Sequence, residues 1–446
     1  MRRYTEENMK TLVEGNELLH SVPENCNVTG KAPVIYLENN LVLDEGNCWQ
    51  FPTLLLGSVG SGKTTIMNKI LKPVMEYTER SGDNIVIFCA KPDMLKFARK
   101  EDIIVSITTK AENACWNIFR EADASDNPDL VLKEIAMSLF AEARERATQV
   151  FFPDAACDML YLTAKFLRDY GKRNNIEMTN GMLVKFLEET PVYATEGKNS
   201  WNDYIESYPE YFSHVRDYIG DGENPQGLGV LSEIRLQIMR ILYGSFASEN
   251  GTFSARESLR AGGKRIFLYY DYCNSGRSTL SVFKVLLELL LKQAMGDTEH
   301  KTWIFLDEAS LLPKIEIFEA LSYGRDPFDN GTGGVRIIMA LQSARLMTRR
   351  YTQLEAETLL SLFPNIIAMR VSDSFSREVV SERYGKARYR YTFEKMNGEL
   401  SYQDSMEEVV NDYAFSRLDK AGKAIISMPG VSKNPFFYNG YIEKES

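Results

Sequence analysis

The chain has 446 residues, of which 44% are hydrophobic, 26% charged and 11% aromatic. These fractions are those of a globular protein, and they exclude collagen, a coiled coil or global disorder as a description of the whole chain. The 62 acidic residues outnumber the 52 basic ones, so the formal net charge is −10. Since a protein that coats DNA with its whole surface would be basic, any nucleic acid must bind on a local patch or in a channel.

The cysteines and the apolar runs indicate where such a chain would reside. Its six cysteines are scattered without a C-x-x-C pair, which favours a reducing compartment and argues against structural zinc. The most apolar stretch, residues 280–295, is shorter than the roughly 20 residues of a membrane span and carries a polar stripe. The first thirty residues contain no apolar run of signal-peptide length. The sequence therefore predicts a soluble chain.

Short apolar runs near both ends of the chain predict a sheet. They are continuous rather than alternating, which is typical of parallel strands that are buried on both faces. We expect strands at 51–56, 84–90, 102–106, 265–271, 302–307, 335–341 and 364–371. Helical patterns lie between several of them, at 64–76, 279–295 and 314–323. The alternation predicts an α/β fold with a mainly parallel sheet flanked by helices. A further aromatic strand is expected after Asn434.

The pattern changes to helical periodicity between residues 113 and 262. Apolar residues recur at three and four positions over 130–148 and from Asp154 onward, and Thr179 is in position to cap a third helix. We therefore expect an all-helical domain at 113–262, inserted into a nucleotide-binding domain. The first part of that domain would lie within 1–112, together with an N-terminal segment, and the second part within 263–446.

A phosphate-loop motif follows the first expected strand. It fits G-x-x-x-x-G-K-[ST] at every position, and its residues are Gly57, Ser58, Val59, Gly60, Ser61, Gly62, Lys63 and Thr64. The glycines let backbone N–H groups turn toward a polyphosphate, and the helix that follows adds a favourable dipole. Lys63 would contact the β and γ phosphates of ATP, and Thr64 would hold Mg²⁺. Thr65, the next residue of the helix, completes the expected nucleotide site.

Two carboxylates end the expected strand 302–307. In a phosphate-loop ATPase the first, Asp307, would hold the water shell of Mg²⁺, and the second, Glu308, would polarise the attacking water. Two acidic residues also end many strands simply because that end is solvated. The phosphate loop favours the catalytic interpretation, and the adjacent glutamate favours an ATP-hydrolysing motor over a small-molecule kinase.

Other polar and charged residues follow the expected strands and helices and are candidates for the same site. Gln342 ends strand 335–341 and is a candidate sensor of the γ phosphate. Arg325 follows the expected helix 314–323, where it is either a solvated helix-end residue or catalytic. Three arginines after Gln342 are interpreted as a basic surface stripe, with the first and second on one helix face: Arg345, Arg349 and Arg350. Residues 91–93 are interpreted as a turn.

These motifs, taken together, resemble the type IV secretion coupling ATPases, the TraG/TraD-like DNA-transfer family. The similarity runs from about residue 50 to about 430 in the same order, through VIFCAKPDMLKFA, CWNIF, RIFLYYDY, DEASLLPKIEIFEALSYGRD and GVRIIMALQSARL. The resemblance implies a RecA-like motor, usually hexameric, that drives DNA into a secretion channel. It also implies that Arg325 reaches the nucleotide of a neighbouring subunit.

The resemblance further implies partners and a location, and three features depart from the family. The expected partners are DNA, a relaxase or other transfer substrate, channel or membrane-anchor proteins and further copies of the chain. The location would be cytoplasmic, or peripheral at the inner face of the membrane through a partner. The departures are the absence of transmembrane helices, Cys89 in place of a usual Asp, and an extra loop at 326–334.

Two alternatives remain open at this stage. One is an ATPase that handles protein cargo or processes DNA outside secretion. The other is a nucleotide-gated scaffold that hydrolyses little ATP and docks a partner on the helical domain. The Asp307–Glu308 pair favours hydrolysis over the scaffold.

Overall fold

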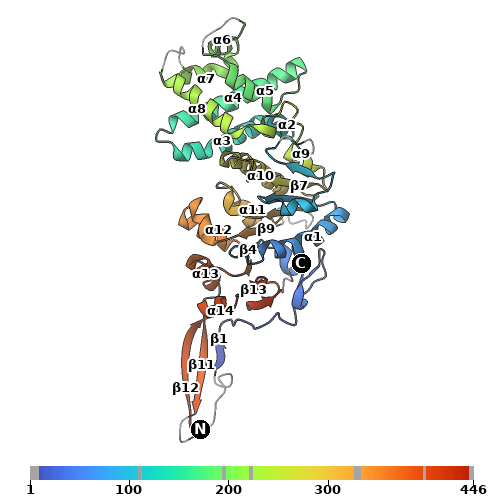
Figure 1. Cartoon of the computed structure of the whole chain (residues 1–446), viewed down its shortest axis with the longest axis vertical. Coiled ribbons are helices and arrows are strands. Elements are labelled where there is room, and N and C mark those ends of the chain that lie inside the picture. Colours follow the sequence, from blue (N-terminus) through green and yellow to red (C-terminus); the bar gives the residue numbers. More distant parts are fainter. Residues whose placement is uncertain are drawn as a thin grey trace.

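The structure is a computed structural model, and it describes residues 10–108, 110, 113–192, 197–219, 225–325, 333–394 and 398–440. Figure 1 shows three parts along the long axis of the molecule. Helices occupy one end, a sheet flanked by helices lies in the middle, and a narrow antiparallel sheet projects at the other end. Among the described residues, no helix is long and apolar enough to cross a membrane.

The main sheet has nine strands in the order β14-β13-β10-β4-β9-β8-β5-β7-β6. The run from β10 to β6 is parallel, and β13 and β14 add an antiparallel edge. Every strand that the apolar runs predicted is present, with ends that differ by up to three residues. The strands are β4 (Thr53–Leu56), β5 (Asn84–Cys89), β6 (Ile103–Val105), β7 (Arg265–Tyr269), β8 (Thr302–Leu306), β9 (Val335–Leu341), β10 (Asn365–Ala368), β13 (Lys423–Ser427) and β14 (Phe436–Asn439).

Helices bury both faces of this sheet, as a parallel sheet requires. One face packs on α1 (Lys63–Ser81) and on the N-terminal segment that contains β2 (Ile35–Tyr36) and β3 (Val42–Leu43). The other face packs on a second group of helices: α10 (Leu280–Met295), α11 (Phe318–Tyr323), α12 (Gln353–Ser361), α13 (Ser374–Ser381) and α14 (Asp412–Ser416). The predicted α/β fold with a mainly parallel sheet is therefore confirmed.

The predicted helix 314–323 is wrong in its first four residues. Residues 314–316 lie outside any helix, Ile317 is the N-cap, and α11 begins only at Phe318. Ile315 and Ile317 are buried on either side of the exposed Glu316, an alternation with a period of two rather than the period of a helix. The hydroxyl of Tyr351 bonds both the N–H and the carbonyl of Ile315, at 3.1 Å each, so this backbone is paired without a helix.

The described part of 113–262 contains helices and no β-strand of the kind found in the main sheet. The helices are α2 (Ile118–Asp123), α3 (Pro128–Arg146), α4 (Phe151–Asn174), α5 (Asn180–Glu189), α6 (Trp201–Ser207), α7 (Pro209–Ile219), α8 (Pro225–Ile241) and α9 (Ala255–Arg260). Thr179 caps α5, as predicted, by accepting a hydrogen bond from the N–H of Met182.

Buried polar side chains join the two ends of this helical segment. The Asn117 amide donates to the carbonyls of Met178 and Gly251, at 2.9 Å each, and its oxygen caps α2. Glu121 is fully buried and accepts hydrogen bonds from the N–H groups of Ala255 and Arg256. Because these groups are paired, the first and last turns of the segment are held together next to the sheet.

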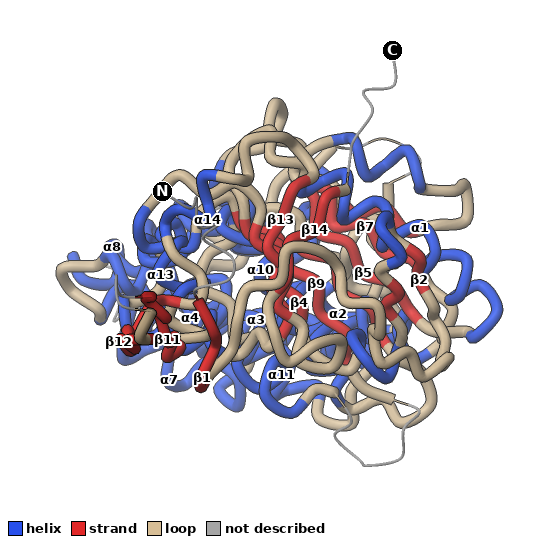
Figure 2. The backbone as a smooth tube through the Cα atoms, turned by 90° about the horizontal axis from the view of Figure 1, so that it is seen from below, coloured by secondary structure: helices blue, strands red, loops and turns tan. Residues whose placement is uncertain are grey.

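The projecting sheet was not predicted. It consists of β1 (Lys10–Glu14), β11 (Lys386–Glu394) and β12 (Leu400–Glu408), all antiparallel. Figure 2 shows these strands at one side of the molecule, away from the main sheet. β11 alternates polar with aromatic side chains and β12 is mostly polar, so both lack the continuous apolar runs of the buried strands. The charged end after residue 440 and most of the extra loop at 326–334 lie outside the described residues.

Candidate nucleotide site

The phosphate loop lies between β4 and α1, at the carboxyl edge of the main sheet. Gly60 and Gly62 have φ values of 73° and 105°, a region that L residues rarely occupy. A Cβ at Gly57 would lie 2.6 Å from the Ser61 hydroxyl oxygen, so only glycine fits there. The start of the loop is bonded to the neighbouring strand β9, because the N–H of Gly57 donates to the carbonyl of Leu341 at 3.1 Å.

Lys63 is the first residue of α1, and its side chain crosses back over the loop. Its ammonium donates to the carbonyls of Gly57 and, at 3.2 Å, Ser58. Burial lowers the pKa of Lys63, and the carboxylates of Glu308 and Asp307 act in the opposite direction. Thr64 follows at the start of the helix, half-buried. The loop and this helix end therefore bring one ammonium, one hydroxyl and a row of backbone donors to one place.

Asp307 and Glu308 directly follow β8. Asp307 is 8% exposed, and its N–H donates to the carbonyl of Phe88 in the neighbouring strand at 2.9 Å. Burial, and next the Glu308 carboxylate, raise the pKa of Asp307, while Lys91 and Lys63 lower it. Glu308 has φ 65° and ψ 55°, a strained conformation for a residue with a side chain, and the Ser310 hydroxyl donates to its carboxylate.

Gln342 lies at the same edge of the sheet, at the end of β9, which is the strand between β4 and β8. It is half-buried and follows directly on Leu341, the last residue of that strand. Because β4, β9 and β8 are neighbours and parallel, their carboxyl ends present the phosphate loop, Gln342 and Asp307 side by side. Ser343, the next residue, caps the 3-10 helix η8 (Ala344–Arg349).

The arginines that follow Gln342 do not form the predicted stripe. In a 3-10 helix, residues three apart share a face, so Arg345 and Arg349 are turned about 120° from each other. Both are exposed, whereas Arg350 is half-buried. The predicted shared face rested on the spacing of an α-helix and is wrong.

Arg325 lies at the opposite edge of the sheet. Its guanidinium is 5.5 Å from the centre of the Phe51 ring, and its carbonyl accepts from the Arg336 guanidinium at 2.7 Å. Phe51 precedes β4, and Gly57 is six positions further along the chain that forms this strand, a span of roughly 20 Å. The structure therefore brings Lys63, Asp307, Glu308 and Gln342 together and places Arg325 away from the site of its own chain.

Two further cations lie at the site and were not recognised from the sequence. Lys91 follows β5, and its charge acts on both Asp307 and Lys63. Arg370 follows β10: its carbonyl accepts from the N–H and hydroxyl of Ser58, at 2.7 and 2.9 Å, and its guanidinium donates to Val59 at 3.3 Å. Both residues end predicted strands. Their position after a parallel strand was the available signal.

Oxygen ligands for a magnesium ion are present at the carboxyl edge. The Thr64 hydroxyl and the Asp307 carboxylate come from the two elements that flank β9, and hard oxygen donors are what Mg²⁺ prefers. In such sites the phosphate groups supply the remaining ligands. The donor set therefore fits a magnesium nucleotide.

The strand order and the loop define a RecA-like nucleotide-binding protein, since a polar strand end lies between the phosphate-loop strand and the Asp-Glu strand. A family model described as the type IV secretion-system coupling protein DNA-binding domain matches residues 47–411. The chain belongs to this family of type IV secretion coupling proteins. No match was found among curated protein sequences.

Solved structures share the fold at low sequence identity. The bacterial conjugative coupling protein TrwBΔN70, in complex with sulphate, has a TM-score of 0.71 and 18% identity, with 98% of this chain and 96% of that chain covered. The plasmid coupling protein TrwB in complex with ADP and Mg²⁺ has a TM-score of 0.70 over the same shares, also at 18% identity. VirB4 of Thermoanaerobacter pseudethanolicus has a TM-score of 0.54 and 13% identity, with 97% and 99% covered.

Proposed function

We propose that the chain is an ATP-hydrolysing motor that moves DNA, with an attached relaxase or other transfer substrate, toward a secretion channel. One observation carries the proposal: neighbouring parallel strands deliver the phosphate loop, Gln342 and the Asp307–Glu308 pair to one edge of the sheet. The fold is shared with a coupling protein crystallised with ADP and Mg²⁺. The cofactors of this chain are accordingly ATP and Mg²⁺.

Each residue of the site has a defined task in this proposal. Backbone N–H groups of residues 57–65 hold the phosphates, and Lys63 leaves the loop carbonyls to contact the β and γ phosphates. Thr64 and Asp307 would hold Mg²⁺, which would supply positive charge next to the phosphates. Glu308 orients and polarises the attacking water, and its strained backbone directs the carboxylate. Gln342 contacts the γ phosphate from the middle strand.

Arg325 completes the site of an adjacent subunit in a homo-hexamer. It is exposed at the edge opposite the phosphate loop, so a neighbour in a head-to-tail ring can receive its guanidinium. The helical domain at 113–262 is a separate insertion that meets transfer substrates. We place the protein in the cytoplasm, at the inner face of the membrane through a partner.

Binding and turnover of ATP by two variants test this assignment. Lys63→Ala removes the ammonium that faces the phosphates and should weaken ATP binding by about ten- to a hundredfold. Glu308→Gln keeps the shape of the side chain but removes the base, so ATP affinity should stay near that of the wild type while turnover falls by about a thousandfold. Calorimetric titration and a phosphate-release assay measure the two effects.

The outcome also separates the motor from the scaffold. Equal ATP affinity in the wild type and Lys63→Ala would contradict the assignment of the loop as the phosphate-binding site. Tight ATP binding without turnover in the wild type, with and without DNA, would favour the nucleotide-gated scaffold. Lys72→Ala, an exposed position on the same helix α1, is the matched control and should leave both quantities unchanged.

A further inference from the structure

A groove between the helical insertion and the sheet domain contains a concentration of arginines. Its volume is about 700 Å³, and it is lined by residues of α3, α8, the segment around the 3-10 helix η6 (Arg277–Thr279), and the end of η8. Four guanidinium groups come from these four elements, against two carboxylates from Glu142 and Glu233: Arg146, Arg240, Arg277 and Arg350. In a chain of net charge −10, this is a local excess of positive charge.

Two of these arginines are engaged, and two are available. Arg146 pairs with Glu142 at 2.7 Å, and Arg350 lies 4.0 Å from the same carboxylate. Arg240 and Arg277 are both exposed, and neither guanidinium has a hydrogen bond or ion pair within the part of the chain that the structure describes. Unpaired guanidinium groups keep their donors free for an anionic ligand.

The two available arginines are fixed next to each other by hydrogen bonds between their elements. The Ser278 hydroxyl donates to the Arg240 carbonyl at 2.6 Å. The N–H of Gly276 donates to the Tyr243 hydroxyl at 2.9 Å. The backbone on both sides of the groove is therefore held in register, which lowers the entropic cost of binding a ligand that meets both side chains.

The groove is also connected to the nucleotide site. Arg350 directly follows η8, and η8 directly follows Gln342 and Ser343, so one short helix separates the γ-phosphate sensor from the groove. Arg277 follows β7 on the carboxyl side of the sheet, the edge that carries the phosphate loop. A change in the position of Gln342 would therefore move one wall of the groove.

We propose that this groove binds the sugar–phosphate backbone of a DNA strand through Arg240 and Arg277, and that η8 couples this contact to the nucleotide site. Phosphodiester groups fit the chemistry, since guanidinium groups bind phosphate in pairs of hydrogen bonds and the net charge of the chain disfavours DNA elsewhere. The inference rests on the proposed function and gives it a specific DNA contact.

The salt dependence of DNA binding tests the groove. Fluorescence anisotropy would follow a labelled oligonucleotide, single-stranded and duplex, over a range of salt concentrations. The Arg240→Ala/Arg277→Ala variant should bind the single strand more weakly, and the slope of log K against log salt should shrink by about 1.4, or about 0.7 per lost contact. Basal ATP turnover should be unchanged, while its stimulation by DNA should be lost.

A matched variant removes the same charge from the other edge of the sheet. Arg260 and Lys264 are exposed next to the start of β7, whereas Arg277 follows its end. Arg260→Ala/Lys264→Ala should keep the affinity, the slope and the stimulation. The groove proposal would be overturned by an equal loss of DNA affinity in both variants, or by an unchanged DNA affinity in the groove variant. Displacement of the oligonucleotide by millimolar dTMP would also overturn it, because the site would then bind free nucleotides.

The same titration keeps the two proposals apart. If the wild-type protein binds no DNA even at low salt, the proposed DNA motor fails, and the groove proposal fails with it. If the wild type binds DNA and the groove variant binds equally well, only the groove is excluded. Circular dichroism and melting curves of each variant check the fold, which exposed substitutions should leave intact.

Discussion

At the scale of single residues, the candidate site brings together groups whose ionisation is altered by burial. Asp307 has a raised pKa and Lys63 a lowered one, and in both cases the largest cause is removal from water. Each shift disfavours the charged form that a magnesium nucleotide requires. Opposite charges nearby reduce both shifts, so the site holds its charges at a cost in stability.

The variant Asp307→Asn measures how much the buried charge of Asp307 costs in stability. A carboxyl group whose pKa is raised on folding binds more protons in the folded state, so its contribution to stability is present at low pH and is lost as the pH rises through its folded pKa. At neutral pH the ionised, buried carboxylate therefore destabilises the wild type, and Asn removes this cost. We expect a melting temperature about 1 to 3 °C higher at neutral pH, together with a loss of turnover of about a hundredfold or more.

The pH dependence supplies the control for this prediction. The gain in melting temperature should shrink as the pH falls through the raised pKa of Asp307, because the wild-type carboxyl group is then protonated and no longer carries a buried charge. Asp93→Asn, an exposed position near the same site, should leave the melting temperature nearly unchanged. A variant less stable than the wild type at neutral pH would contradict the burial argument.

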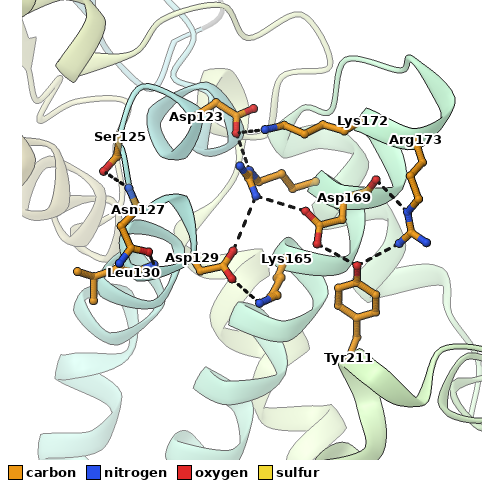
Figure 3. Close-up of polar contacts among 11 residues, drawn as sticks. Asp123, Ser125, Asn127, Asp129, Leu130, Lys165, Asp169, Lys172, Arg173 and Tyr211 are labelled. Carbon is orange, nitrogen blue, oxygen red and sulfur yellow. Dashed lines mark hydrogen bonds and ion pairs between the residues drawn. The ribbon is translucent and has the colours of Figure 1, made fainter.

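At the scale of elements, the helical insertion depends on ion pairs between its helices as well as on its core. Figure 3 shows Asp123 of α2, Asp129 of α3 and Asp169 of α4 facing the basic side chains of α4. Arg168, whose side chain is 11% exposed, lies 2.5 Å from Asp123, 3.3 Å from Asp169 and 3.8 Å from Asp129. One guanidinium thus joins α4 to the two helices that precede it.

Arg168→Ala should therefore loosen the insertion and leave the sheet domain intact. Removing the cation leaves Lys172, at 2.8 Å, as the remaining partner of Asp123 and takes the guanidinium from Asp169, so we expect a loss of about 1 to 3 kcal/mol in stability. Hydrogen exchange should rise in α2 and α4 and stay unchanged in β4 and β8. Arg146→Ala, an exposed position on α3, is the control, and uniform exchange across the chain in Arg168→Ala would contradict a local role.

The elements that the sequence predicted correctly are those with one dominant signal. The parallel strands are continuous apolar runs because both faces are buried, and the phosphate loop needs glycines at positive φ. The projecting strand β11 alternates polar with aromatic side chains, such as Tyr389, Tyr391 and Phe393, β12 is mostly polar, and an Asn397–Gly398 turn signal follows β11. That signal was present but differs from the continuous runs of the main sheet.

Other features depend on contacts between distant segments and could not be predicted. Residues 314–317 directly precede a helix, but the hydroxyl of Tyr351 bonds both backbone groups of Ile315 and so pairs them without a helix. The order of the strands decides that Gln342 lies between the phosphate loop and Asp307. The same order places Arg325 at the far edge. A local pattern contains no information on which strands become neighbours. The sequence places Lys91 and Arg370 at strand ends, but only the folded sheet shows that these ends meet at the nucleotide site.

At the scale of the whole molecule, the proposed hexamer requires that one chain complete the nucleotide site of another. Arg325→Ala and Glu308→Gln should each be nearly inactive, because one lacks the charge that stabilises the transition state and the other the base. If the arginine acts in trans, mixing the two variants restores complete sites where a Glu308→Gln subunit lends its arginine to an Arg325→Ala neighbour. In a random ring at equal amounts this is roughly a quarter of sites.

Turnover across mixing ratios, after sizing has established that mixed rings form, measures this effect. A maximum near equal proportions supports a contribution in trans. If no mixture regains activity even in a single-turnover assay, Arg325 does not complete a neighbouring site. Arg345→Ala serves as the control. It also removes an exposed arginine, but one at the carboxyl edge of the sheet, so this variant should stay active on its own.

Steady-state ATP turnover of the purified chain with increasing amounts of single-stranded and duplex DNA tests the claim that the protein is a DNA-driven motor. A DNA-driven motor predicts that turnover rises with DNA and saturates, and that this stimulation fades as salt increases, because counter-ions displace the phosphates from a local basic surface. Turnover that is the same with and without either form of DNA at every salt concentration, in the presence of the cognate secretion components, would contradict the claim.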